Sequence, residues 1–510
     1  MSDRKCVKIG TQEAWYGLCV EDGPDLPITS TSTFCRKLTP NESVNGAAGI
    51  LVSSDGRYLY CAGGVQVSAQ NGFLEMCSPD AQVIFEEGHG TLRGAWTALV
   101  RDRLPAGHAI PPALFFTAPQ YNTWIELLYE QTQAGILAYA RALLANGYPP
   151  GVLMIDDGWM RDYGTWEFVP ERFPDPREMV DQLHAMGFRV MLWVSPFVSP
   201  DSPVFRDLRD TNVLLRDAQG EIAVREWWNG YSAVLDLSDE EGVNWLHGRL
   251  DSLMEQYGVD GFKMDAGDAK FYRDDDRSAG NVTANEQSTL WAKAGLHYAY
   301  NEFRACYAMA NAPLVQRLAD KNHSWDRYGV GSLVANTLTQ GMLGYPFSCP
   351  DMIGGGAYIN FIENSKTLDL ELFVRYAQCA ALMPMMQFSA APWRVLPPEE
   401  NALCLKAAKL HGEYAELILK LAKHAAETGE PIVRYMEYCF PHQGMQSVCD
   451  QFMLGDALLA APVLAKGVRQ RDVVLPAGRW KYVDGTVYDG GRTVTVPAGL
   501  DTLPYFILQS

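Results

Sequence analysis

An acidic residue at the end of an apolar segment is the first feature of this sequence that could do chemistry. The stretch VDGFKMDAGD (259–268) leads from apolar positions into Asp265, as expected of a buried strand that delivers a carboxylate to its C-terminal end. Lys263 lies two positions earlier, so on a strand it points to the same side and can keep that carboxylate ionised. An ionised carboxylate acts as a nucleophile or a base. This stretch alone leaves open that Asp265 only caps the next helix.

A second carboxylate is required if Asp265 cleaves a glycosidic bond, because one acid protonates the leaving oxygen while another group attacks or activates water. The candidates are Asp320, Asp326 and Asp351. Asp320 stands in the polar loop QRLADKNHSWDRYG, and an acid in a loop beside an aromatic side chain suits a proton donor. The alternative is that Asp320 caps the start of a helix.

The elements that must position these side chains alternate between helices and strands. Helices are predicted at 131–146, 176–186, 240–257 and 371–381, and strands at 152–155, at 188–194 and directly before Asp265. Further barrel strands are predicted within 306–309, 344–349 and 382–388. Such alternation favours a closed parallel (β/α)8 barrel, whose active sites lie at the carboxyl ends of the strands.

Segments rich in β structure flank this region. The first part of the chain shows short alternating runs between turns, and the last part has hairpin signals at DG and GG. We therefore predict a multidomain α/β protein with an N-terminal β-sandwich (1–118), a catalytic (β/α)8 TIM barrel (119–428) and a C-terminal β-sandwich (429–510).

The composition restricts the class of protein. The chain of 510 residues is 47% hydrophobic, has a formal net charge of −19 and contains no apolar run long enough to cross a bilayer. The negative charge disfavours nucleic acids and anionic membranes as partners. The N-terminus lacks the apolar segment of a signal peptide, so we expect a cytoplasmic protein. The 11 cysteines lack the paired spacings of a zinc site and are expected to be buried reduced thiols.

The candidate acids lie in motifs that resemble glycoside hydrolase family 31, the retaining α-glycosidases. DGFKMDAGD is similar to the nucleophile segment of the family, which makes Asp265 the nucleophile and Asp268 the acidic residue three positions later, where the family usually has Glu. In the family an aromatic residue follows the acid/base Asp after five positions. Asp320 and Trp325 have this spacing, so the resemblance assigns the acid/base role to Asp320, with Asp326 as the second choice.

The resemblance also implies a sugar-binding pocket around these acids. IDDGWM is similar to the first-strand segment whose Asp binds sugar hydroxyls, and the turn after LTQGMLGYPFSC is similar to the acidic turn after the seventh strand. Tryptophans are added as pocket walls because a sugar stacks well on an aromatic ring, although each of them is as well explained as core. The expected substrate-binding residues are Asp156, Asp157, Trp193, Trp227, Trp228, Lys263, Asp268, Arg317, Asp351 and Trp393.

The implied activity is that of an exo-acting retaining α-glycosidase, which needs neither a metal nor an organic cofactor. Family α-glucosidases commonly have Trp two residues before the nucleophile, whereas this chain has Lys263. The motifs are most similar to the branch that contains the myogenesis-regulating glycosidase, which resembles α-galactosidases, so an α-galactoside is the preferred substrate. The alternatives are an α-glucosidase or α-xylosidase, a transglycosylase, or a catalytically silent carbohydrate-binding protein. The expected partner is a small oligosaccharide or glycoside, and a homo-oligomer is left open.

Overall fold

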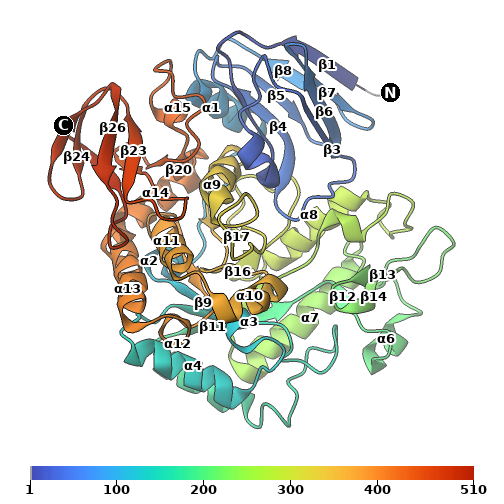
Figure 1. Ribbon diagram of the computed structural model, residues 1–510. Helices are drawn as coiled ribbons and strands as arrows, with labels where there is room; N and C mark the ends of the chain where they lie inside the picture. Colours follow the sequence, from blue (N-terminus) through green and yellow to red (C-terminus); the bar gives the residue numbers. More distant parts are fainter. Residues whose placement is uncertain (1–2, 510) are drawn as a thin grey trace.

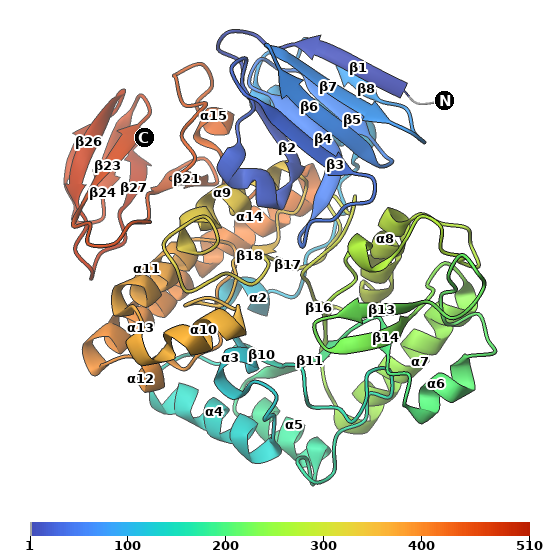
Figure 2. The ribbon, with the colours of Figure 1, turned by 45° about the vertical axis from the view of Figure 1, so that its right-hand side comes forward.

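A computed structural model describes residues 3–509 and shows a parallel β-barrel with an N-terminal and a C-terminal β-rich region, which lie next to each other above the barrel in Figures 1 and 2. The barrel sheet has eight strands in the order β18-β17-β16-β15-β11-β10-β9-β19, all paired in parallel. The barrel is nearly closed, because Ile353 N just beyond β18 donates to Gln387 O in β19 at 2.8 Å. The predicted TIM barrel with flanking β domains is confirmed.

The barrel strands are short. Their bounds are β9 (Gln120–Asn122), β10 (Val152–Ile155), β11 (Arg189–Val194), β15 (Gly261–Met264), β16 (Tyr300–Phe303), β17 (Gln316–Arg317), β18 (Ser348–Cys349) and β19 (Gln387–Phe388). Gly261 is required in β15 because a Cβ there would lie 1.9 Å from Tyr300 O of the neighbouring strand. The prediction of a barrel strand within 306–309 is wrong. The strand is β16, and Tyr307 instead bridges to Ala47 of the N-terminal region.

Helices cover the outside of the barrel (Figure 2). They are α4 (Gln133–Ala145), α5 (Pro176–Ala185), α7 (Glu240–Tyr257), α8 (Ala284–Gly295), α9 (Leu333–Met342), α11 (Leu370–Ala381), α13 (Pro398–Glu413) and α14 (Ala415–Thr428). The caps explain where they begin and end: Asp239 accepts from Glu241 N at the start of α7, and Gly258 ends that helix with φ +75°. The helix predicted at 240–257 is confirmed with the same bounds.

A small antiparallel sheet is inserted between β11 and α7. It consists of β12 (Phe197–Val198), β14 (Gly230–Val234) and β13 (Val224–Trp227), in that order. This insertion was absent from the sequence prediction. Its β13–β14 turn carries Trp228 and Asn229.

The N-terminal region is a sandwich of two four-stranded antiparallel sheets. One has the order β1 (Asp3–Lys8), β7 (Phe73–Ser78), β6 (Val65–Gln70) and β3 (Phe34–Leu38). The other has the order β2 (Trp15–Cys19), β4 (Ala47–Ser53), β5 (Tyr58–Cys61) and β8 (Ile84–Glu86). A 3-10 helix, η1 (Val20–Asp25), leads from β2 toward the barrel helix α9.

The C-terminal region has a six-stranded and a two-stranded sheet around a core of its own that includes Trp480 and Phe506. The sheets contain β20 (Val433–Arg434), β21 (Phe452–Leu454), β22 (Leu458–Ala460), β23 (Gln470–Leu475), β24 (Arg479–Tyr482), β25 (Val487–Asp489), β26 (Arg492–Pro497) and β27 (Tyr505–Gln509). The DG signal lies in the β24–β25 hairpin, as predicted.

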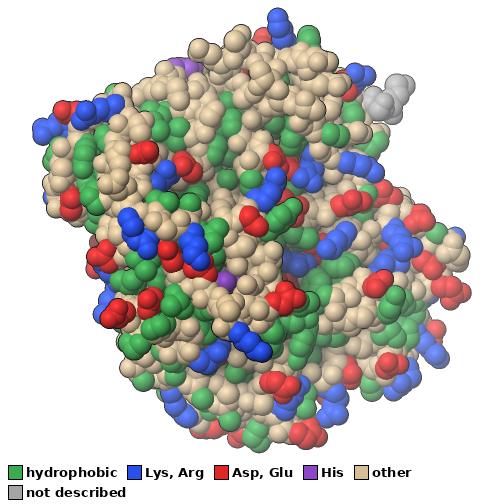
Figure 3. All heavy atoms as spheres, viewed as in Figure 1, with side chains coloured by type: hydrophobic (Ala, Val, Ile, Leu, Met, Phe, Trp, Pro, Cys, Tyr) green, Lys and Arg blue, Asp and Glu red, His purple; other side chains and the backbone are tan. Residues whose placement is uncertain are grey.

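Acidic and basic side chains are interspersed over the face shown in Figure 3. Six of the 11 cysteines are buried and unpaired as expected, whereas Cys6 and Cys35 are exposed. Within residues 3–509, no helix is both long and apolar enough to cross a membrane.

Candidate active site

Asp265 directly follows β15 at the carboxyl end of the barrel and is 8% exposed. Trp193 Nε1 donates to its Oδ2 at 2.7 Å, and Arg304 Nε lies 3.5 Å from its Oδ1. Burial alone raises the pKa of the Asp265 carboxyl, but the charges of Arg304, Lys263 and Arg317 lower it well below its usual value. The hydrogen bond from Trp193 acts in the same direction. Asp265 is therefore ionised at neutral pH.

Arg304 joins the two acids of the DGFKMDAGD segment. It comes directly after β16, donates to Oδ2 of the buried Asp268 and faces Asp265. On its other side, its guanidinium lies 4.6 Å from the centre of the Trp228 ring. Burial lowers the pKa of Arg304, but Asp268, Asp265 and Asp320 together raise it, so the arginine stays charged. Asp268 therefore acts on the site through Arg304.

Lys263 and Asp156 form a buried ion pair between β15 and the end of β10. Lys263 Nζ lies 2.6 Å from Asp156 Oδ2. Lys263 lowers the pKa of Asp265 as its position two residues earlier predicted, but its direct partner is Asp156. The neighbouring Asp157 accepts from Asn229 Nδ2 at 2.6 Å, and burial together with the Asp156 charge raises the pKa of Asp157 to about 7.

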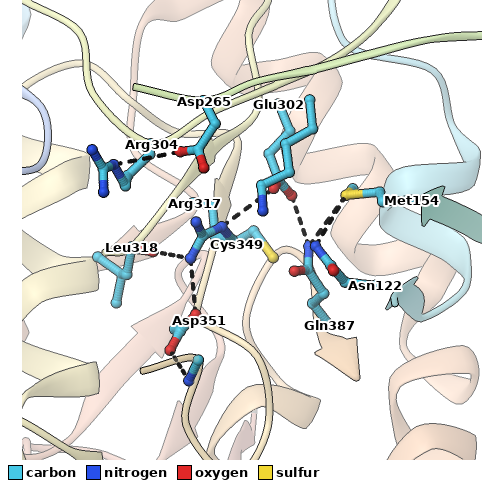
Figure 4. Close-up of polar contacts among 12 residues, drawn as sticks. Asn122, Met154, Asp265, Glu302, Arg304, Arg317, Leu318, Cys349, Asp351 and Gln387 are labelled. Atoms are coloured by element: carbon cyan, nitrogen blue, oxygen red, sulfur yellow. Dashed lines mark hydrogen bonds and ion pairs between the residues drawn. The ribbon is translucent and has the colours of Figure 1, made fainter. Parts of the chain in front are cut away.

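Arg317 is the centre of a second cluster, at the end of β17 (Figure 4). Its Nη1 donates to Asp320 Oδ1 and to Asp351 Oδ1, both at 2.9 Å, and its Nε lies 3.3 Å from Glu302 Oε1. Burial lowers the pKa of Arg317, but these three acids raise it well above its usual value. Burial raises the pKa of Asp351 to about 7 even though Arg317 opposes that effect.

The structure separates Asp320 and Asp326, the first and second choices for the acid/base residue. Asp320 follows β17, contacts Arg317, and leaves 37% of its side chain exposed at the open end of the barrel. Asp326 accepts from Ser324 Oγ at 2.7 Å and from Tyr328 N at 2.9 Å, so it stabilises a turn. Of these two residues, only Asp320 is thus brought together with the Arg317 cluster.

Aromatic side chains divide between the site and the core. Trp227 stacks on Trp193, with ring centroids 6.4 Å apart, and Trp228 is 42% exposed above Arg304. Trp393 is not brought to this cluster. It lies in α12 (Pro392–Val395), and its ring packs at 6.0 Å on Tyr139 of the outer helix α4. Trp393 is therefore part of the packed layer outside the barrel. This position agrees with the alternative interpretation of Trp393 as a core residue.

Several polar residues of the site were missed by sequence reasoning. Glu302 is fully buried in β16, where Gln387 Nε2 donates to its Oε2 at 2.7 Å. Tyr163 donates to Asp157, and Asn229 reaches the same carboxylate from the inserted sheet. The acidic Glu302 within YNEF and the Arg304 just after it are the signals in the sequence that could have indicated a polar strand end, although acidic residues are depleted in strands.

Together these groups form two buried charge clusters linked through the arginines. Asp265 and Asp320 both raise the pKa values of Arg304 and Arg317, so each arginine interacts with both acids. One acid is buried and ionised and the other is partly exposed, an arrangement that suits covalent and acid–base steps on a single substrate. Within residues 3–509, no group of three or more His, Cys, Asp or Glu side chains is placed to hold a metal ion.

Comparisons with known proteins agree with this architecture. The family description "Glycosyl hydrolases family 31 TIM-barrel domain" matches residues 109–411, and "Glycosyl hydrolase family 31 C-terminal domain" matches residues 429–509. The myogenesis-regulating glycosidase of Mus musculus is 34% identical over 415 residues, which are 79% of this chain and 57% of that protein. The 1,3-alpha-isomaltosidase of Kribbella flavida is 26% identical, over 72% of this chain and 53% of that protein.

Among solved structures, a Flavobacterium johnsoniae family 31 dextranase complexed with glucose has a TM-score of 0.85 at 20% identity, over 99% of this chain and 66% of that one. This likeness supports the fold. The chain spans little more than half the length of the curated relatives above. With most of its barrel and its C-terminal region matched by the models of one family, the chain belongs to glycosyl hydrolase family 31.

Proposed function

We propose that this chain is a retaining exo-α-glycosidase that hydrolyses terminal α-linked sugars by double displacement. The observation that carries the proposal is the contrast between its two central acids. Asp265 is buried and kept ionised by Arg304 and Lys263, whereas Asp320 is 37% exposed where a leaving group would depart. The first environment suits a nucleophile and the second a group that exchanges protons with substrate and water.

In the first step a carboxylate oxygen of Asp265 attacks the anomeric carbon. Oδ1 is the better candidate, because Oδ2 already accepts from Trp193 and Oδ1 accepts no hydrogen bond within residues 3–509. The bond from the anomeric carbon to the leaving oxygen breaks as that oxygen takes the proton of Asp320. In the second step Asp320 takes a proton from water, the water oxygen bonds to the anomeric carbon, and Asp265 is released.

The sugar is proposed to lie among the buried charges around Asp265. Asp156 and Asp157 are the candidates for binding hydroxyl groups on one side, and Arg304 and Asp351 for the other side. Trp193 and Trp227, stacked on each other, form one apolar wall. Trp228 is exposed at the rim and is the candidate platform for the leaving group.

An α-galactoside is the preferred substrate in this proposal. Its support is the resemblance of the motifs to the branch of the myogenesis-regulating glycosidase, together with Lys263 in place of the Trp of family α-glucosidases. The ion pair of Lys263 with Asp156 constrains one oxygen of a hydroxyl-binding carboxylate, which changes the hydroxyl pattern that it can accept. An α-glucosidase or α-xylosidase is the alternative, since relatives with those names are 23% and 24% identical.

The first experiment is hydrolysis of p-nitrophenyl α-galactoside, α-glucoside, α-xyloside and α-N-acetylgalactosaminide. We expect release from the α-galactoside by the wild type, with α-galactose as the first product in proton NMR. Asp265→Ala should reduce kcat by at least about 10⁴-fold. Cleavage of another sugar would move the substrate assignment, and no cleavage of any substrate would contradict the proposed activity.

Azide distinguishes the nucleophile from the acid/base residue, because it can act in place of whichever carboxylate is removed. With an activated aryl α-glycoside, Asp320→Ala should form an α-glycosyl azide, since azide attacks the intermediate from the side that Asp320 vacates. Asp265→Ala should form the β-glycosyl azide. Asp326→Ala is the matched control and should keep hydrolytic activity within about threefold, because Asp326 lies in a turn. The opposite pair of azide products would overturn the assignment.

A further inference from the structure

A side chain from the N-terminal sandwich reaches the carboxyl end of the barrel. Asn45 lies in the loop between β3 and β4 and is 1% exposed. Its Nδ2 donates to Arg304 O at 2.9 Å and to Arg317 O at 3.1 Å, and its Oδ1 accepts from Ala319 N at 3.0 Å. Both amide hydrogens and the amide oxygen are thus used on backbone groups of the barrel.

These contacts lie where two barrel strands separate. The β16–β17 ladder contains a single residue pair, Phe303 with Gln316, whereas β15 and β16 share four. The next residue on each strand is Arg304 or Arg317, and the Asn45 amide joins their carbonyl groups. Asn45 therefore takes the place of the missing ladder at the point where both arginines leave the barrel.

The loop that carries Asn45 is itself held against the barrel. Ala47 N donates to Cys306 O at 3.2 Å, and Ala308 N donates to Ala47 O at 2.9 Å. Gly46 lies so close that a Cβ would approach within 2.8 Å of the Tyr345 ring. Because Ala47 is hydrogen-bonded to the barrel and Gly46 is packed against it, the neighbouring Asn45 has a fixed position.

The two arginines that Asn45 joins are the ones that organise the acids. Arg304 faces Asp265 and binds Asp268, and Arg317 binds Asp320. The third contact, Ala319 N, belongs to the residue directly before Asp320. One buried amide therefore sets the relative positions of the strand ends that carry both sides of the reaction.

We propose that Asn45 is a positioning residue that couples the N-terminal sandwich to the catalytic centre by holding the backbones of Arg304, Arg317 and Ala319 in register. This inference rests on the proposed glycosidase function for its kinetic consequence, but its structural consequence can be measured without turnover. Loss of the amide frees the two strand ends to move apart, and displacements of about 1 Å at reacting groups can cost about 100-fold in rate.

The test compares Asn45→Ala with Asn285→Ala, a matched control. Asn285 in α8 is also buried and joins the same two regions, since its Nδ2 donates to Leu38 O at 2.9 Å and its Oδ1 accepts from Asn41 N at 2.8 Å. None of these contacts involves the residues that carry the acids. We expect Asn45→Ala to lower kcat about 10- to 100-fold with KM changed less than about threefold, and Asn285→Ala to keep kcat within about twofold.

The second measurement is the indole N–H resonance of Trp193, assigned with Trp193→Phe in protein labelled with ¹⁵N-tryptophan. Trp193 donates to Asp265, so displacement of Arg304 should shift or broaden this resonance in Asn45→Ala and not in Asn285→Ala. Asn45→Ser keeps one hydroxyl for hydrogen bonding and should give intermediate effects if Asn45→Ala does not fold.

Equal kcat losses in the two alanine variants with an unmoved Trp193 resonance would overturn the inference. A wild type that cleaves no glycoside would contradict the proposed function alone. In that event the Trp193 spectra would still decide the role of Asn45.

Discussion

Burial and charge give the carboxylates of the site different protonation behaviour. Asp265 is buried among three cations, which lower its pKa, whereas Asp157 is buried beside another acid and has its pKa raised to about 7. Asp157 also accepts hydrogen bonds from Asn229 and Tyr163. An aspartate can therefore stay ionised at position 265 and bind a proton at position 157 of the same site.

Asp157 should make stability depend on pH. Its folded-state pKa is raised, so the folded protein binds the proton more tightly than the unfolded chain and loses stability as pH rises from about 4 to 7. Asp157→Asn should remove this loss, with a gain of up to about 4 kcal/mol at pH 8 relative to pH 4. Urea unfolding at pH 4, 6 and 8 measures it. Because Asp351 has the same direction of shift, part of the slope should remain.

At the scale of elements, the ends of the barrel strands position the two candidate acids, and close contacts between neighbouring strands hold those strands in place. Asp265 and Asp320 each follow a short strand by one to three residues, so small shifts of β15 or β17 move them directly. The inserted sheet adds two contacts through its β13–β14 turn. The Trp228 ring packs on the Arg304 guanidinium, and Asn229 donates to Asp157. The site is thus assembled from several short elements that have little stability of their own.

Two glycines differ in the space around them, because Gly261 lies in a packed strand and Gly248 on the exposed face of a helix. Gly261→Ala in β15 should cost at least about 2 kcal/mol, because the new Cβ would meet Tyr300 O at 1.9 Å and force β15 from β16. Gly248→Ala in α7 should stabilise the protein by about 0.5–1 kcal/mol, since nothing lies within 4 Å and alanine favours the helix. Urea unfolding of both variants checks the pair, and a stable Gly261→Ala variant would refute the packing argument.

At the scale of the whole molecule, both flanking β regions are bonded to the barrel by buried polar side chains. Asn45 makes the N-terminal contact near the site. For the C-terminal region, Arg375 of α11 is 1% exposed and donates to Ala498 O at 2.7 Å and to Thr502 O at 3.1 Å. Burial lowers the pKa of Arg375 to about 10. The Arg375 guanidinium therefore holds the C-terminal region against α11 by binding its backbone carbonyl groups.

Removal of Arg375 should loosen the C-terminal region. Arg375→Ala leaves several buried carbonyl groups without donors and should cost about 3 kcal/mol or more. Calorimetry should show a lower transition temperature, and limited proteolysis should cut first in residues 429–509. Arg469→Ala is the control: this exposed arginine pairs with Glu371 and should cost no more than about 1 kcal/mol. Equal effects of both variants would contradict the proposed anchoring.

The sequence by itself determined the elements whose patterns are local. The apolar run 152–155 predicted β10 with Asp156 and Asp157 after it, the helical pattern predicted α7 with its observed bounds, and the motif around Asp265 indicated the family. These features depend on residues close together in the chain, so local sequence patterns are sufficient to reveal them.

Only the tertiary structure decided which distant residues meet. A two-residue strand such as β17 has no periodicity, and the buried acid of β16 departs from the pattern of an apolar strand, whereas the strand predicted within 306–309 does not form. The sequence does not reveal the partners of Arg304 and Asn45, because these partners lie on other strands and in another region. Charged groups are stable inside this barrel only once those partners surround them, and that pairing is a property of the folded chain.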